Sequence, residues 1–159
     1  MDCINENILN NLLGAFTMVE KKGIIGIIYD NNGGLLYFLL VHKNLPGNKA
    51  WEFVKGHVIG EMDTEEAVKQ EINETVGLKK YSIKKKLDFP FPVSDGQDII
   101  LNDVFLVETS MNIPVKLDYD PNKLNTYLWS NKKRTLETLS ESHKQLLEKA
   151  MPEIEKLIS

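Results

Sequence analysis

The sequence predicts an α/β sandwich, in which helices cover both faces of a central sheet. Three observations support this fold class: two apolar segments joined by a turn, a long acidic helix near the middle of the chain, and an amphipathic helix at its end. Continuous apolar strands are typical of sheets buried on both faces, and strands that alternate with helices are typical of α/β folds. Periodicity alone does not choose among such folds.

The first strands are predicted from branched and aromatic residues. Residues 23–29 read GIIGIIY and residues 35–42 read LLYFLLVH. The DNNGG sequence between them is a strong turn signal, so the two segments are predicted to form a β-hairpin. Residues 51–54 (WEFV) are expected to form a short strand that leads into Lys55 and Gly56.

The acidic helix is predicted to begin at Asp63 or Thr64 and to end near Val76. Asp63 and Glu66 resemble a capping box, and Gly77 supplies the expected C-terminal stop. The predicted buried stripe has a spacing of four residues and consists of Val68, Ile72 and Val76.

The second half of the chain is predicted to contain three strands and a final helix. The strands are expected at residues 81–89, 99–108 and 125–129, with FPVSDGQD in a loop between the first two. The final helix is predicted over residues 139–157, where Pro152 is expected to bend or divide it. Its inward face is expected to carry Leu146, Leu147, Ala150, Ile154 and Leu157.

The length suits one compact domain over residues 1–159. Residues 1–20 are interpreted as an N-terminal extension, in which residues 5–17 place apolar side chains at helical spacing. This predicted helix is expected to cover one end of the core. A second interpretation makes it an interface for a homodimer or another protein.

Composition limits the function classes. The formal net charge of -4 excludes a global field that would attract nucleic acid or anionic membranes. The lysines at 79–80 and 84–86 are interpreted as a solvated strand edge rather than a nucleic-acid patch. The only cysteine, Cys3, rules out an internal disulfide. With neither a membrane-length apolar run nor a signal-peptide pattern, a cytoplasmic location is expected.

The chemistry is predicted to lie in residues 55–78. Lys55-Gly56-His57 is expected to form a tight cationic loop before the acidic helix. On that helix Glu71 and Glu74 are three residues apart, so they project from one face, and Glu61 lies in the loop that enters it. Clustered carboxylates suit Mg²⁺, which can neutralise phosphate oxygens and activate water. Taken alone, Glu-x-x-Glu more often marks a solvated helix face.

The spacing of this segment resembles the Nudix box: Gly, five residues, Glu, seven residues, then Arg-Glu-hydrophobic-x-Glu-Glu-x-Gly-hydrophobic. An alignment without gaps matches Gly56, Glu71, Ile72, Glu74, Gly77 and Leu78. Three positions depart from the pattern: Met62 stands for the first Glu, Gln70 for the Arg and Thr75 for the last Glu.

The surrounding sequence extends this resemblance over roughly residues 21–150. WEFVKGHV is similar to the WxFPKGHV approach of the family, with Val54 in place of Pro, and a Tyr-x-Trp triplet follows at Tyr127. This layout is most like the asymmetrical dinucleoside tetraphosphate hydrolases. The resemblance implies a Nudix α/β/α sandwich with a central mixed sheet, and hydrolysis of a nucleoside polyphosphate with Mg²⁺ or Mn²⁺.

The resemblance also implies roles for individual residues. Glu71 and Glu74 would be metal ligands, Glu61 would take part of the place of the missing Glu, and the backbone carbonyl near Lys55 would complete the set. Glu71 would also orient or deprotonate the attacking water. The phosphates would meet the side chains of Lys55 and His57, and a base would stack on Tyr127. Tyr127 can equally be an ordinary strand residue, and for His57 an ordinary role, in which it only satisfies a loop carbonyl, is the favoured interpretation.

The substitution at Thr75 leaves two functional hypotheses open, because it replaces a principal metal ligand of the family with a neutral side chain. The first is a nucleoside polyphosphate hydrolase, and the second is a catalytically impaired Nudix domain that binds a nucleotide or a protein partner. The family often uses a further acidic residue on a later loop, for which the candidates are Asp95, Asp98, Asp103 and Asp120. Residues 91–98 are either a substrate-side lid or a plain connection.

Overall fold

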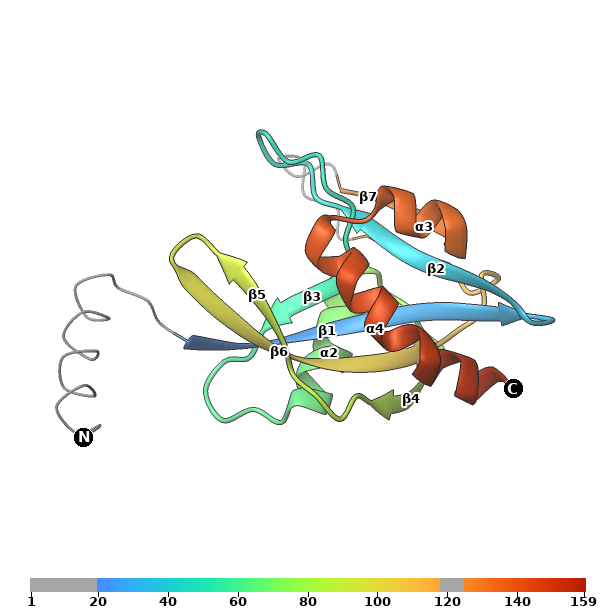
Figure 1. Cartoon of the computed structure of the whole chain (residues 1–159), viewed down its shortest axis with the longest axis horizontal. Helices are drawn as coiled ribbons and strands as arrows, with labels where there is room; N and C mark the ends of the chain where they lie inside the picture. Colours follow the sequence, from blue (N-terminus) through green and yellow to red (C-terminus); the bar gives the residue numbers. More distant parts are fainter. Residues whose placement is uncertain (1–19, 118–124) are drawn as a thin grey trace, which may run out of the picture.

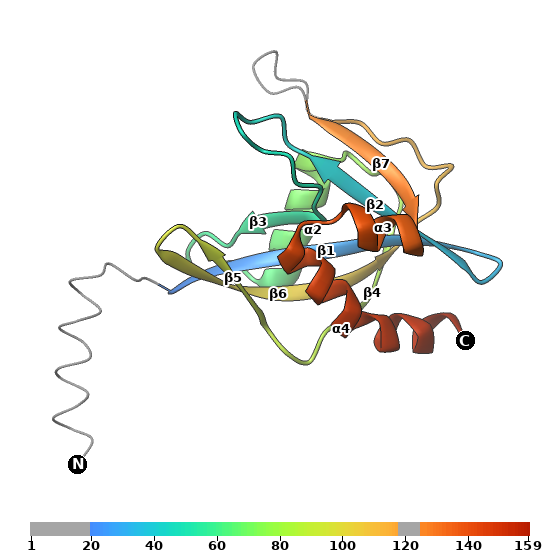
Figure 2. The same ribbon diagram turned by 45° about the horizontal axis from the view of Figure 1, so that its top comes forward.

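The computed structural model describes residues 20–117 and 125–159. A seven-stranded sheet lies at its centre, with α2 on one face and α4 on the other (Figures 1 and 2). The strands are β1 (Glu20–Asn32), β2 (Leu35–His42), β3 (Val54–His57), β4 (Ser82–Lys86), β5 (Phe91–Asp95), β6 (Asp98–Glu108) and β7 (Thr126–Asn131). The helices are α2 (Thr64–Thr75), α3 (Lys132–Thr138) and α4 (Glu141–Ile158). The predicted sandwich with a central mixed sheet is therefore confirmed.

The parallel pair of β1 and β6 forms the axis of the sheet, with register partners from Glu20 and Ile99 to Tyr29 and Glu108. All other pairings between the described strands are antiparallel, and the main path runs β4-β6-β1-β2-β7. The second edge of β1 is shared, because β3 pairs with its first half and β2 with its second half. In the same way β5 and β4 divide one edge of β6.

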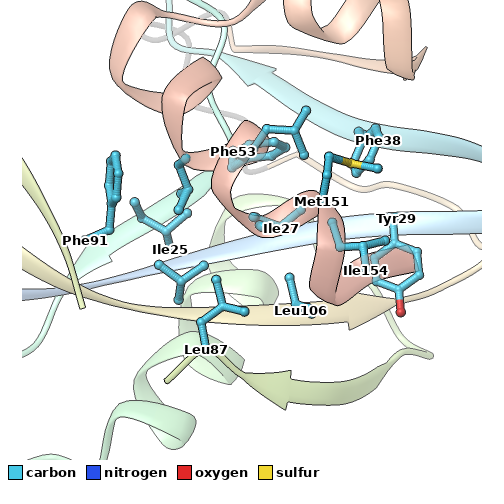
Figure 3. Close-up of a cluster of buried hydrophobic side chains, with 14 of the residues drawn as sticks. Ile25, Ile27, Tyr29, Phe38, Phe53, Leu87, Phe91, Leu106, Met151 and Ile154 are labelled. Carbon is cyan, nitrogen blue, oxygen red and sulfur yellow. The ribbon is translucent and has the colours of Figure 1, made fainter. Parts of the chain in front are cut away.

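The sheet separates two apolar clusters. On the α4 side, Met151 and Ile154 pack against residues of the sheet such as Ile27 and Phe38 (Figure 3). On the α2 side the predicted stripe of Val68, Ile72 and Val76 is fully buried. Successive residues of β1 alternate between the two clusters, and this explains why its sequence is apolar without interruption.

The predicted hairpin and acidic helix are confirmed. The β1–β2 turn carries Gly33 and Gly34 at φ values of 63° and 92°, the left-handed region that glycine adopts without strain. Gly77, at φ 57°, follows the end of α2 as predicted. The capping box is not formed, because Asp63 occupies the N-cap position but its side chain makes no capping hydrogen bond.

Two predictions near the acidic helix need correction. Residues 51–54 were expected to form a strand, but the strand is Val54–His57, because Gly56 and its neighbours pair with residues 23–26 of β1. Lys55-Gly56-His57 is therefore part of an edge strand rather than a loop. Trp51 and Glu52 make only isolated bridges, to Leu139 and Val41.

The predicted loop FPVSDGQD is a β-hairpin. Its first five residues form β5, which pairs with β6 through a turn at Gly96 and Gln97. Phe91 is buried and Val93 packs against the α4-side core, so β5 buries one of its faces. The lid hypothesis for residues 91–98 therefore applies to a hairpin and not to a loop.

The C-terminal region contains one helix more than predicted. Residues 132–138 form α3, where the side chain of Asn131 accepts a hydrogen bond from the backbone N–H of Arg134. The final helix begins at Glu141 rather than at residue 139, and Pro152 lies within it without dividing it. Leu157 is 37% exposed and does not face inward as expected. The helix predicted at residues 5–17 lies outside the described residues, and no described helix is long and apolar enough to span a membrane.

We predict that Gly77→Ala destabilises the protein more than Gly33→Ala. Both substitutions place a Cβ in the left-handed region, at a cost of roughly 1–2 kcal/mol. A Cβ at Gly77 would also lie 2.6 Å from the carbonyl oxygen of Lys116, whereas nothing lies within 4 Å of one at Gly33. Urea unfolding should show an additional loss of roughly 1–3 kcal/mol for Gly77→Ala. Equal losses would mean that the contact with Lys116 is not tight in solution.

Candidate functional site

A cavity of about 270 Å³ lies beside the first half of β1, bordered by β3, β5, β6, the middle of α2 and the start of α4. Its walls combine apolar, cationic, acidic and amide groups. They are formed by Ile25, Lys43, Lys55, Gly56, His57, Glu71, Val93, Ser94, Asp95, Ile100, Asn102 and His143. Concave sites with apolar walls and a few convergent polar groups are typical ligand sites.

Residues from two parts of the predicted segment 55–78 line this cavity. Lys55, Gly56 and His57 come from β3, and Glu71 comes from α2. The carboxylate of Glu71 lies so close to Gly56 that a Cβ there would overlap it. The hydroxyl of Thr75 donates a 2.9 Å hydrogen bond to Oε1 of Glu71. The departure at Thr75 therefore gives Glu71 a hydrogen-bonded neighbour in place of a second carboxylate.

Three other predicted site residues lie outside the cavity walls. Glu74 is exposed, and its Oε1 accepts a 3.0 Å hydrogen bond from the side-chain amide of Gln70. Glu61 is exposed in the loop before α2. Tyr127, on β7, is 44% exposed and pairs with Val41.

The later acidic candidates lie in different places in the structure. Asp95 lines the cavity at the end of β5. Asp98 forms an ion pair of 2.7 Å with Lys21, and Asp103 one of 3.2 Å with Lys86. Asp120 lies outside the described residues. Of the candidates that the structure describes, Asp95 is the one positioned to reach a ligand.

The described residues do not form a metal centre by themselves, because no three side chains of the types His, Cys, Asp and Glu are grouped to hold an ion. The four-residue ligand set implied by the resemblance is therefore not assembled. Of the predicted metal ligands, Glu71 and the adjacent backbone of Lys55 and Gly56 line the cavity.

Sequence reasoning missed His143, which lines the cavity from the first turn of α4. Its side chain is fully buried, and its ring stacks on Phe53 with centroids 5.7 Å apart. The backbone N–H of Phe53 donates a 3.0 Å hydrogen bond to Nδ1. Nε2 of His143 lies 3.6 Å from Oε2 of Glu52, which also accepts a 2.9 Å hydrogen bond from Lys55.

These surroundings keep the imidazole of His143 neutral. The pKa of His143 is lowered from 6.5 to about 4: burial is the largest cause, Glu52 partly opposes it and Lys55 adds to it. A sequence signal for this residue existed, since His143 precedes Leu146 and Leu147 by three and four residues and so shares their buried face.

Asn102 and Lys43 also line the cavity and were not predicted. The amide of Asn102 is buried and donates hydrogen bonds to the carbonyl oxygens of Phe91 (3.1 Å) and Ile100 (3.3 Å). Its side chain lies directly against Gly23, where any Cβ would overlap it. No local sequence pattern marks these residues, because Asn102 reaches the site through the pairing of β6 and Lys43 through its place directly after β2.

No protein-family model and no curated protein matches the chain. Solved structures do match. An Ap4A hydrolase from C. elegans superposes with a TM-score of 0.69 at 19% identity, over 86% of this chain and 98% of its own. The MutT protein of Methanosarcina mazei Go1 superposes with a TM-score of 0.69 at 18% identity, over 86% and 96%. The NUDIX domain of Shewanella oneidensis NrtR, complexed with ADP ribose, gives 0.65 at 15%, over 86% and 89%. At these identities the likeness shows the fold.

We predict that stability falls between about pH 6.5 and pH 4 because of His143. Its pKa is about 4 in the folded protein and 6.5 as the ordinary value. Between these values the unfolded chain binds a proton that the folded protein does not, so the free energy of unfolding decreases with falling pH, by roughly 3 kcal/mol in all. Urea unfolding at several pH values measures this slope.

The matched variant is His143→Asn, whose side-chain oxygen can still accept from the Phe53 N–H. This variant should lose the His143 part of the slope. An unchanged slope in His143→Asn would assign the acid sensitivity to other groups.

Proposed function

We propose, on the premise that this chain has the Nudix fold, that it hydrolyses a nucleoside polyphosphate in the cavity beside Gly56. The observation that carries the proposal is the carboxylate of Glu71, held against Gly56 in a wall that also contains Lys55. A dinucleoside tetraphosphate is the first substrate to test. The likeness to a structure named an Ap4A hydrolase supports this choice.

The side chains of the cavity suit a polyphosphate. Lys43 and Lys55 place two ammonium groups in the cavity wall. The cavity therefore attracts anions locally, whereas the whole chain has a net charge of -4. Glu71 is the residue for positioning or deprotonating the attacking water. Its Oε1 is oriented by the Thr75 hydroxyl, which limits how far the carboxylate can rotate.

The residues of the cavity would hold a divalent cation together with the substrate phosphates. Mg²⁺ usually binds through one or two carboxylates together with substrate phosphates rather than in an all-protein cage. Glu71 and the backbone at Lys55 and Gly56 would hold it, and Asp95 lines the same cavity. When bound, the ion supplies neutralisation of phosphate charge.

The second candidate function is nucleotide binding without hydrolysis. Glu74 lies outside the cavity and is engaged by Gln70, and Thr75 is neutral, so the site has fewer carboxylates than the box pattern contains. The similar NrtR structure is a NUDIX domain complexed with ADP ribose, which supports testing that ligand as well.

We predict that the purified protein converts diadenosine tetraphosphate in the presence of Mg²⁺ or Mn²⁺, and that Glu71→Gln lowers the rate by roughly two to three powers of ten. Glu66→Gln is the matched control, because it removes an exposed carboxylate from the same helix, away from the cavity. Products are resolved by chromatography. If the protein binds nucleotide but turns it over no faster than Glu71→Gln, the binding function replaces the enzymatic one.

We also predict that Thr75→Glu raises the hydrolysis rate by roughly two powers of ten, because a second carboxylate strengthens the attraction for the cation. Thr75→Gln has the same length without the charge and serves as the control. A rate increase in both variants, or in neither, would show that the charge at this position does not limit catalysis.

A further inference from the structure

One carboxylate oxygen beside the cavity faces two donors. Oε2 of Glu52 accepts from Nζ of Lys55 at 2.9 Å and lies 3.6 Å from Nε2 of His143. The first contact is a hydrogen-bonded ion pair. The second is too long for a hydrogen bond.

The nitrogen that faces Glu52 is a donor without an acceptor. Nδ1 of His143 accepts the backbone N–H of Phe53, so the neutral ring carries its proton on Nε2. Nε2 is buried and has no hydrogen-bond partner among the described residues. Buried donors rarely stay unpaired, since each unmet bond destabilises the structure.

We propose that Glu52 positions Lys55 in the free protein and exchanges it for His143 when an anion binds. This inference rests on the proposed function, which places phosphate oxygens beside Lys55. In the exchange, the ammonium of Lys55 turns to the anion and Oε2 of Glu52 accepts the Nε2–H of His143. Glu52 is then the positioning residue, and His143 is its second partner.

The exposure of the three groups favours this exchange. The side chain of Lys55 is 40% exposed and can reach a ligand, whereas that of Glu52 is 19% exposed and that of His143 is buried. A partly buried carboxylate that loses its cation is costly unless another donor replaces it. Oε2 needs to move by only about 0.7 Å toward His143 to complete a hydrogen bond.

The first experiment observes His143 directly. ¹⁵N-edited NMR at neutral pH records the Nε2–H signal, which shifts downfield when the hydrogen bond to Glu52 forms. Lys55→Met should show the shifted signal without any ligand, because Glu52 has lost its competing partner. Lys43→Met is the matched control, because Lys43 lines the same cavity but forms no ion pair with Glu52 in the described structure. In this variant the His143 signal should match that of the wild-type protein.

The second experiment adds inorganic pyrophosphate to the wild-type protein. The His143 signal should move toward its position in Lys55→Met as the cavity fills. Calorimetry then compares two variants: His143→Gln keeps a donor near the Nε2 position, and His143→Asn keeps only the acceptor near Nδ1. We expect His143→Asn to bind pyrophosphate up to about tenfold more weakly than His143→Gln.

The outcomes separate this inference from the proposed function. An unshifted His143 signal in Lys55→Met would overturn the exchange even if nucleotides are hydrolysed. A shifted signal in Lys55→Met, together with no pyrophosphate binding by wild type, would overturn the anion trigger but leave the alternative partners of Glu52 established. The proposed function would still be decided by the hydrolysis assay. Bound pyrophosphate that leaves the wild-type signal unmoved would also contradict the exchange.

Discussion

The parallel pairing of β1 with β6 is the constraint on which the rest of the structure depends. Because these strands run side by side for ten register pairs, each has one further edge for other strands, and each edge is divided between two partners. The division places β3 and β5 on opposite sides of the axis at the same end of the sheet. The cavity lies at this end of the sheet, bordered by these two short strands and by the start of α4.

Close backbone approach then determines what the cavity contains. Gly23 on β1 leaves room for the buried amide of Asn102, and Gly56 on β3 leaves room for the carboxylate of Glu71. Both glycines lie in strands, where they are needed for space rather than for an unusual backbone conformation. Two departures from the box pattern also form contacts. Thr75 and Gln70 each hydrogen-bond a retained glutamate, so these polar groups of the helix are satisfied although the helix carries fewer charges.

Much of the fold could be predicted from local patterns. The β1–β2 hairpin, α2 and the glycine that follows it were predicted because their signals are local: branched residues, a glycine-rich turn and a four-residue apolar spacing. The predictions failed where pairing overrides local preference. Lys55-Gly56-His57 and FPVSDGQD resemble loops in sequence, yet both become strands because β1 and β6 present unpaired edges to them. The short helix α3 carried no long periodic pattern to indicate it.

The sequence by itself determined the α/β class and the box-like spacing that brings Glu71 toward Gly56, since one loop and one helix set that geometry. Only the tertiary structure decided the rest of the site. Helical spacing places Glu71 and Glu74 on one side of α2, but packing against β3 turns Glu71 into the cavity and leaves Glu74 in solvent. Glu52 and His143 are 91 positions apart in the chain, and only the docking of α4 on the sheet makes the buried imidazole a neighbour of the ion pair with Lys55.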